Sequence, residues 1–229
     1  MTVSPVSPSQ TREALAEPRF RLADDFPVLS RLIGDPRLAR LEADFRDFLR
    51  RLPEGDAGRR LPVFLAGLAD LGDRPVLTEL AAFEWALAAA ARAPAEAPLP
   101  PEELDQLPAE AWPGLRLAFN PSLERIDTEW NSVPLWRAVR EETEPPLPTP
   151  LPATRTWAVW RQNGRTRFRP LPPDDAWALD LAVRGYPFGE ISRALCRWLP
   201  PREAAPFATR MVGDWLDSGW ITELRTAAD

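Results

Sequence analysis

The nucleophilic and basic side chains decide which reactions a chain can catalyse, and this chain has few of them. Its 229 residues contain no histidine and one cysteine, and all 28 basic residues are arginine. Serine–histidine pairs, histidine-based zinc sites and lysine Schiff bases are therefore excluded. Because carboxylates, one tyrosine and one thiol remain, we expect no catalytic residue and no metal or cofactor held by this chain.

Two groups could still support chemistry. Cys196 lies in ISRALCRWL, where a small buried residue is the expected interpretation and the nucleophile of a stand-alone enzyme is the alternative. Glu124, Asp127 and Glu129 share a short segment and could act as acid and base or bind a hard cation. No calcium-loop pattern accompanies them, so we interpret these three carboxylates as a solvated acidic surface.

The arginines gather where the sequence predicts a β-hairpin. Two β-rich runs flank Asn163-Gly164 in TWAVWRQNGRTRFRPL, a signal typical of a two-residue type I′ turn. The resulting register places Val159 opposite Phe168 on a core face, and Trp160 opposite Arg167 on the other face. We therefore expect an exposed Trp160 indole suited to cation–π stacking with its neighbours. The arginines on that face are Arg165, Arg167 and Arg169.

Helical patterns and proline runs organise the rest of the chain. Apolar residues at three- and four-residue steps predict helices over 35–52, 61–72 and 74–94. An acidic, proline-rich middle follows, with two short strands around Asn120-Pro121 and a helix in NSVPLWRAVREE. We expect a mobile N-terminus (1–18), a helical domain (19–94), a linker and middle segment (95–152) and a C-terminal domain (153–229).

Three helices and a final strand follow the hairpin, an order typical of a winged-helix module. They are predicted over 172–185, 186–200 and 201–217, with the strand in WITEL. The predicted fold is mainly α with a small β component, and the last domain is winged-helix-like. No stretch approaches the roughly 18 apolar residues of a membrane helix, and no export signal is visible, so we expect a cytoplasmic protein without membrane contact.

A winged helix binds either DNA or an extended peptide, and the residues leave both interpretations open. Helix 201–217 carries Arg202 and Arg210 but also three acids, and the pI near 5.0 disfavours binding to phosphates. Strand 165–169 and helix 201–217 would instead form a groove for an acidic peptide that adds a strand. In a third interpretation, the arginines only solvate an edge strand and discourage aggregation.

Several phrases between residues 20 and 224 resemble one family. They include DDFPVLSRLIGDPRLARLEADFRDFL, RPVLTELAAFEWALAAA, FNPSLERIDTEWNSVPLWRAV and WAVWRQNGRTRFRPLPPDDAWALDLAVRGYPFGEISRAL. Together they resemble the HvfC/BufC-type proteins, long labelled a DNA-binding domain family. The C-terminal phrases are also similar to the winged-helix elements that recognise precursor peptides in pathways for ribosomally synthesised, modified peptides (RiPPs).

The resemblance implies a partner protein of a multinuclear non-haem iron-dependent oxidative (MNIO) enzyme. The iron would lie in that enzyme, while this chain would form a heterodimer with it and present the ribosomal precursor peptide. The alternative is a sequence-specific DNA-binding regulator. For peptide binding we expect Trp160, Arg165, Arg167, Phe168, Arg169, Arg202 and Arg210. For docking to the enzyme we expect exposed tryptophans such as Trp130 or Trp136, and core packing is the alternative for each.

Overall fold

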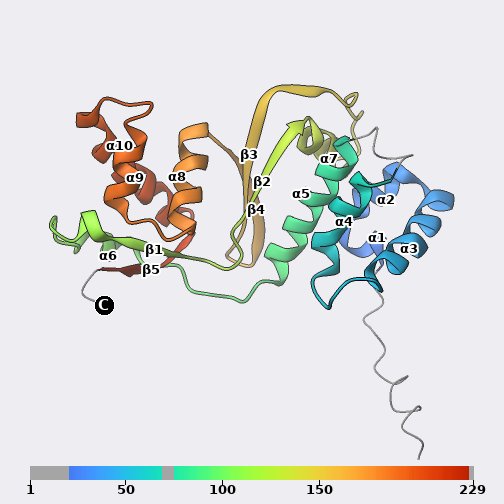
Figure 1. The fold of residues 1–229 in the computed structure, drawn as a ribbon, viewed down its shortest axis with the longest axis horizontal. Coiled ribbons are helices and arrows are strands. Elements are labelled where there is room, and N and C mark those ends of the chain that lie inside the picture. Colours follow the sequence, from blue (N-terminus) through green and yellow to red (C-terminus); the bar gives the residue numbers. More distant parts are fainter. Residues whose placement is uncertain (1–20, 69–74, 227–229) are drawn as a thin grey trace, which may run out of the picture.

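The computed structural model describes residues 21–68 and 75–226, and helices predominate over strands in these ranges (Figure 1). The fold is mainly α with a small β component, as the sequence predicts. The helices are α1 (Leu22–Asp25), α2 (Pro27–Ile33), α3 (Asp35–Leu49), α4 (Ala57–Ala66), α5 (Pro75–Arg92), α6 (Pro101–Asp105), the 3-10 turn η1 (Trp112–Gly114), α7 (Ser132–Arg140), α8 (Pro173–Val183), α9 (Phe188–Leu195) and α10 (Pro201–Asp217). The strands are β1 (Arg116–Phe119), β2 (Glu124–Trp130), β3 (Pro150–Gln162), β4 (Arg165–Leu171) and β5 (Ile221–Arg225).

Helix α5 is the central helix of the N-terminal half. Its apolar residues pack against α1 to α4 on one side, and against α7 and the sheet on the other. Gly58 lets α4 approach α5 closely, because a Cβ at this position would overlap the Trp85 ring. Helix α4 begins at Asp56, whose carboxylate accepts from the backbone N–H groups of Gly58 and Arg59. The predicted helix end at Gly72 lies outside the described residues.

The strands form two separate antiparallel sheets. One has the order β2-β3-β4, and the other pairs β1 with β5. The two strands around Asn120-Pro121 are present as predicted, but they do not pair with each other: β1 pairs with β5, and β2 pairs with β3. The closing strand predicted in WITEL also exists, and it joins β1 instead of the hairpin.

The β3–β4 hairpin has the predicted register. Gln162 pairs with Arg165, Trp160 with Arg167 and Val159 with Phe168. The two turn residues, Asn163 and Gly164, have φ values of 52° and 72°. Two consecutive residues with positive φ are what a type I′ turn requires, and its twist matches that of the strands.

The three-stranded sheet lies between two helical layers (Figure 1). Helix α5 packs against β2, β3 and β4, whereas α8 packs against β3 from the other side. Both faces of the hairpin therefore meet hydrophobic side chains. This arrangement decides which hairpin residues stay accessible.

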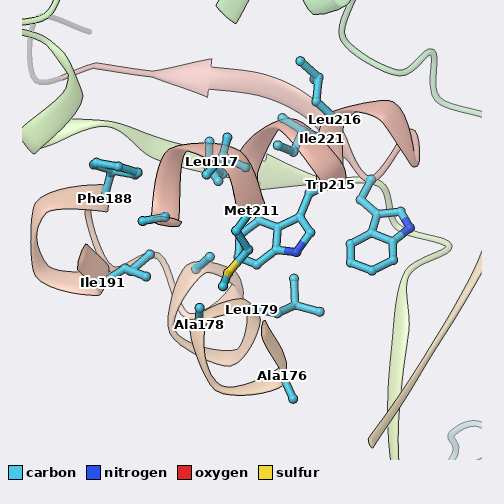
Figure 2. Packing of buried hydrophobic residues seen from close by; sticks show 14 of the residues in the cluster. Leu117, Ala176, Ala178, Leu179, Phe188, Ile191, Met211, Trp215, Leu216 and Ile221 are labelled. Atoms are coloured by element: carbon cyan, nitrogen blue, oxygen red, sulfur yellow. The ribbon is translucent and has the colours of Figure 1, made fainter. Parts of the chain in front are cut away.

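The C-terminal core gathers around Trp215 (Figure 2), and both Trp215 and Trp220 are fully buried. Side chains from α8, α9 and α10 converge there with Leu117 of β1 and Ile221 of β5. Because β1 belongs to the acidic middle of the chain, this core is completed by residues from outside 153–229. None of the helices in the described ranges is long and apolar enough to cross a membrane.

Candidate functional site

Strand β4 is an edge strand, since it pairs only with β3 in the three-stranded sheet. A two-residue hairpin makes its flanking pair, Gln162 and Arg165, a hydrogen-bonded pair. The next residue along β4, Thr166, and then Phe168 must point their N–H and C=O groups away from β3. An independent contact agrees with this alternation of outward and inward main-chain groups. The Arg161 N–H donates to Ser122 Oγ at 3.1 Å, so it points to the β2 side of β3 and away from β4.

The outward main-chain groups of β4 are open to an added strand. Over residues 21–68 and 75–226, no backbone or side-chain group outside the sheet bonds to those of Thr166 or Phe168. Pro170, two residues after Phe168, also points its main chain away from β3. It carries no N–H, as is typical of an edge strand. The edge thus offers two full donor–acceptor positions and one further carbonyl.

Two free cations flank this edge on one face of the sheet. Arg165 and Arg167 are exposed, and neither forms an ion pair with any residue that the structure describes. Arg169 differs from them, because its guanidinium contacts the Asp175 carboxylate at 3.4 Å and lies 4.6 Å from the centre of the Trp220 ring. Arg169 is therefore held by the fold, whereas Arg165 and Arg167 remain available to a ligand.

Trp160 is not the exposed indole that the sequence predicts. It is only 6% exposed and packs edge-to-face on Trp220, with ring centroids 5.3 Å apart. The prediction was wrong because it treated this face of the hairpin as open, while α8 and the Trp220 turn cover it. The cation–π contact on this face is made by Trp220 with Arg169 instead.

The opposite face of the edge is aromatic. Phe168 is half-buried and meets Phe83 and Trp136 edge-to-face, at centroid distances of 5.1 and 5.6 Å. The Arg137 guanidinium of α7 lies 5.6 Å from the centre of the Phe168 ring. One face of the edge is therefore cationic, and the other presents an aromatic surface with Arg137 over Phe168 and Arg161 opposite Thr166.

Asp175 connects the edge to the C-terminal core. It accepts from the Trp215 indole N–H at 2.7 Å and contacts Arg169 at 3.4 Å. Burial raises the pKa of this carboxyl above its usual value, while the bond from Trp215 and the charge of Arg169 oppose the rise. Helix α10 thus reaches the site at its C-terminal end, through Trp215 and through the Asp217 carbonyl, which accepts from Gln162 Nε2 at 3.2 Å.

Arg202 and Arg210 lie away from this contact. On an α-helix, both positions are about 140° around the axis from Trp215, and Arg202 is about 20 Å along it. Arg202 pairs with Glu203 at 3.5 Å, and Arg210 lies over the Phe207 ring. The structure brings together Arg165, Arg167, Phe168 and Arg169, and it separates Arg202 and Arg210 from them.

The two docking tryptophans have different surroundings, and both are half-buried, between the exposed anchor and the core packing that the sequence left open. Trp136 is half-buried against Phe83 and donates its indole N–H to Glu84 at 3.3 Å. Trp130 is half-buried at the wall of an apolar cavity of about 340 Å³. This docking cavity is lined by Leu32, Pro75, Val76, Leu77, Trp130, Leu135, Pro145, Pro146 and Pro148. Beside it, Leu147 is 83% exposed.

Sequence reasoning missed the role of Glu84. Glu84 is 3% exposed and accepts from the backbone N–H groups of Val28 and Leu29, both at 2.9 Å. These are unpaired donors in the first turn of α2, so Glu84 caps that helix from a distance. Burial raises the pKa of Glu84 to about 7 from its ordinary 4.5. The one available signal was a glutamate inside the apolar phrase LAAFEWAL.

Glu79, about one and a half turns before Glu84 on α5, also accepts hydrogen bonds from backbone donors of another element. Its carboxylate accepts from the N–H groups of Glu129 and Trp130, at 2.7 and 3.1 Å, and from the Ser132 hydroxyl. Burial raises its pKa above the usual value despite these bonds. Two carboxylates of α5 therefore stabilise neighbouring elements. Glu84 holds the start of α2, and Glu79 holds the junction between β2 and α7.

The remaining candidates for chemistry stand apart from each other. Cys196 is exposed after the end of α9, so the expectation that it is buried was wrong. Glu124 pairs with Arg59, and Asp127 with Arg125 at 2.8 Å. In the described ranges, no three histidine, cysteine or acidic side chains are grouped so that they could hold a metal ion.

Comparisons with known proteins leave the chain without an assigned relative. No protein-family model matches it, and no curated protein matches its sequence. The function must therefore be argued from the residues at the edge of β4, the docking cavity and their chemistry.

Proposed function

We propose that this chain is a cytoplasmic, non-catalytic partner of an MNIO-type iron enzyme and recruits the precursor peptide that the enzyme modifies. The observation that carries the proposal is the open edge of β4 with two unpaired arginines beside it. An extended peptide can add a strand there through main-chain hydrogen bonds. The resemblance of several phrases of the chain to HvfC/BufC-type proteins supports the choice of partner.

Capture at β4 would act by raising the local concentration of the peptide at the enzyme. A leader segment bound to the edge tethers the modifiable segment, which then meets the iron site in an intramolecular encounter. Effective concentrations for short flexible tethers are on the order of millimolar. The iron and its ligands belong to the enzyme in this proposal, and the chain supplies binding and orientation.

We assign docking of the enzyme to the docking cavity. Its lining is almost wholly apolar, and Leu147 stands exposed in the proline-rich segment at its rim. An apolar anchor of the partner that enters such a cavity would bury surface on both proteins. Trp130 would contact this anchor, whereas Trp136 supports Phe168 at the peptide edge.

Co-expression with an MNIO-type iron enzyme and its precursor peptide separates the two surfaces. Arg165→Glu/Arg167→Glu should lose the precursor and keep the enzyme, because the change adds repulsion only at the edge. Leu147→Asp should lose the enzyme and keep the precursor, since Leu147 is exposed and packs on little. Arg40→Glu/Arg51→Glu, at exposed positions in and after α3, is the control with equal charge change and should keep both.

Two results of this experiment contradict the proposal. In the first, the Arg165→Glu/Arg167→Glu variant binds as much precursor as the unchanged protein does. In the second, the enzyme modifies the precursor fully in the absence of this chain.

The DNA-binding alternative receives less support from the structure. The helix order α8–α9–α10 suits it, but the exposed face of α10 sets Arg202 and Arg210 against Glu203, Asp214 and Asp217. Such a face neutralises few phosphates, and DNA affinity depends on that number. Binding to duplex DNA that falls steeply with salt and keeps a sequence preference would favour this alternative.

A further inference from the structure

We infer that the edge of β4 selects peptides in which acidic and apolar side chains alternate. This inference rests on the proposed peptide capture and names the class of peptide captured. It follows from the two different faces that the edge presents to an added strand. The free cations Arg165 and Arg167 lie on one face, and Phe168 with its aromatic neighbours lies on the other.

An added strand must match these faces residue by residue. Residues opposite each other in neighbouring strands point to the same face, and successive residues point to opposite faces. A peptide residue opposite Arg167 therefore points to the cationic face, and its two neighbours, opposite Thr166 and Phe168, point to the aromatic face. This parity holds whichever way the peptide runs.

The cationic face sets the acidic positions. Arg165 and Arg167 are two residues apart, so their side chains leave the strand about 7 Å apart. Acidic residues at alternate positions of an extended peptide have the same spacing, and each would meet one guanidinium. Arg169 adds less to this pairing, because Asp175 already contacts it and Trp220 lies beneath it.

The aromatic face sets the apolar positions. Phe168 is half-buried, and its ring is surrounded by Phe83, Trp136 and Trp157. A side chain that points to this face would lie against the remaining exposed part of Phe168 and lose contact with water. A carboxylate opposite Phe168 would lose water against these rings, and Arg161, which lies opposite Thr166 on this face, already donates to the Ala91 carbonyl, so apolar residues are favoured.

The chain also limits the length of the recognised segment. At one end, the Asn163-Gly164 turn leads the backbone away from the edge. At the other end, Pro170 lacks an N–H and can only accept a bond. Full main-chain pairing is therefore confined to Thr166 and Phe168, and the recognised segment is short.

Synthetic peptides test the alternation on the full chain. The first probe is a short acetylated and amidated peptide in which aspartate and leucine alternate, and the control has the same composition with the aspartates clustered. Binding is followed by fluorescence anisotropy of a labelled peptide and by amide shifts of β4. We expect the alternating peptide to bind at least about tenfold more tightly, a difference of 1.4 kcal/mol.

A charge swap keeps the test informative even if one variant is less stable. Arg165→Glu/Arg167→Glu should lose the aspartate–leucine peptide and gain affinity for the peptide in which arginine alternates with leucine. Thr166→Pro should weaken both alternating peptides, because it removes an outward N–H without changing charge. The Arg40→Glu/Arg51→Glu control should bind as the unchanged protein does.

The outcomes separate this inference from the proposed function. Equal binding of alternating and clustered peptides, weakened equally by Thr166→Pro, overturns the alternation and leaves strand addition at β4 in place. If Thr166→Pro leaves the affinity for the alternating peptide unchanged, both the alternation and strand addition at β4 are overturned. If the protein binds the natural precursor but not the alternating peptide, the inference is overturned and the proposed function stands.

Discussion

Glu84 is a buried carboxylate whose bonds stabilise the helical half of the molecule. Its two backbone bonds at 2.9 Å satisfy donors that α2 cannot satisfy itself, and Trp136 links it to the aromatic face of the peptide edge. The cost is desolvation, which raises the pKa of Glu84 to about 7. One side chain therefore couples the stability of α2 to pH.

The sign of this coupling follows from the two pKa values. Since the folded protein binds the proton of Glu84 more tightly than the unfolded chain, the stabilisation is complete below pH 4.5 and falls as the pH rises to about 7. Glu84→Gln should remove this fall. It should also cost about 1–3 kcal/mol of unfolding free energy, because an amide NH₂ would replace one acceptor that faces the α2 donors.

Denaturant unfolding at several pH values between 4.5 and 8 measures both effects. The exposed Glu144→Gln is the matched control and should leave the pH dependence unchanged. If the unfolding free energy of Glu84→Gln still falls over this pH range, other groups cause the pH dependence. Glu79 and Asp175 also have raised pKa values.

Strand β4 has two sets of amides that differ only in the direction they point. Those of Arg165 and Arg167 face β3 in the ladder, whereas those of Thr166 and Phe168 face outward. Amide hydrogen exchange of the free chain should therefore alternate along β4, fast at Thr166 and Phe168 and slow at Arg167. Uniform protection along the strand would show that another segment covers the edge, and it would remove the site.

Much of this element was predictable because its determinants are local. The Asn163-Gly164 turn specifies the register, so each pair across the hairpin followed from the sequence. Trp160 was misplaced because its cover comes from Trp220, far along the chain. Glu84 was missed for the same reason, since its partners Val28 and Leu29 are 56 and 55 residues away.

Helix α10 shows a second limit of sequence patterns. The sequence predicted a helix over 201–217, and the structure has α10 at these residues. The spacing could not show that α8 lies between α10 and the hairpin, because periodicity carries no information about which neighbour a face meets. The arginines of α10 were therefore grouped with those of β4, although α10 reaches the site through Trp215 and Asp217 at its C-terminal end.

At the scale of the whole molecule, the acidic middle segment joins the two halves. Strand β1 pairs with β5, β2 pairs with β3, and α7 packs on α5. Leu115 and Leu117 belong to the C-terminal core, and Leu135 and Val139 belong to the N-terminal core. The segment predicted as a linker and middle segment, with two strands and a helix, therefore also supplies core residues to both halves.

Residues 153–229 alone should consequently fail to fold to the native structure. The piece would lack β1, leave β5 unpaired and expose the hairpin face that Phe83 covers. We expect weak near-ultraviolet circular dichroism and poor amide dispersion, compared with the full chain. A native-like spectrum of the piece would show that the C-terminal part is independent of the middle segment.

The central claim is that a precursor peptide adds a strand to the edge of β4. Amide hydrogen exchange on the full chain, with and without the precursor, tests this claim most directly. The account predicts that Thr166 and Phe168 become protected on binding while Arg167, already bonded to β3, changes little. Precursor that binds while Thr166 and Phe168 exchange as fast as before would contradict it.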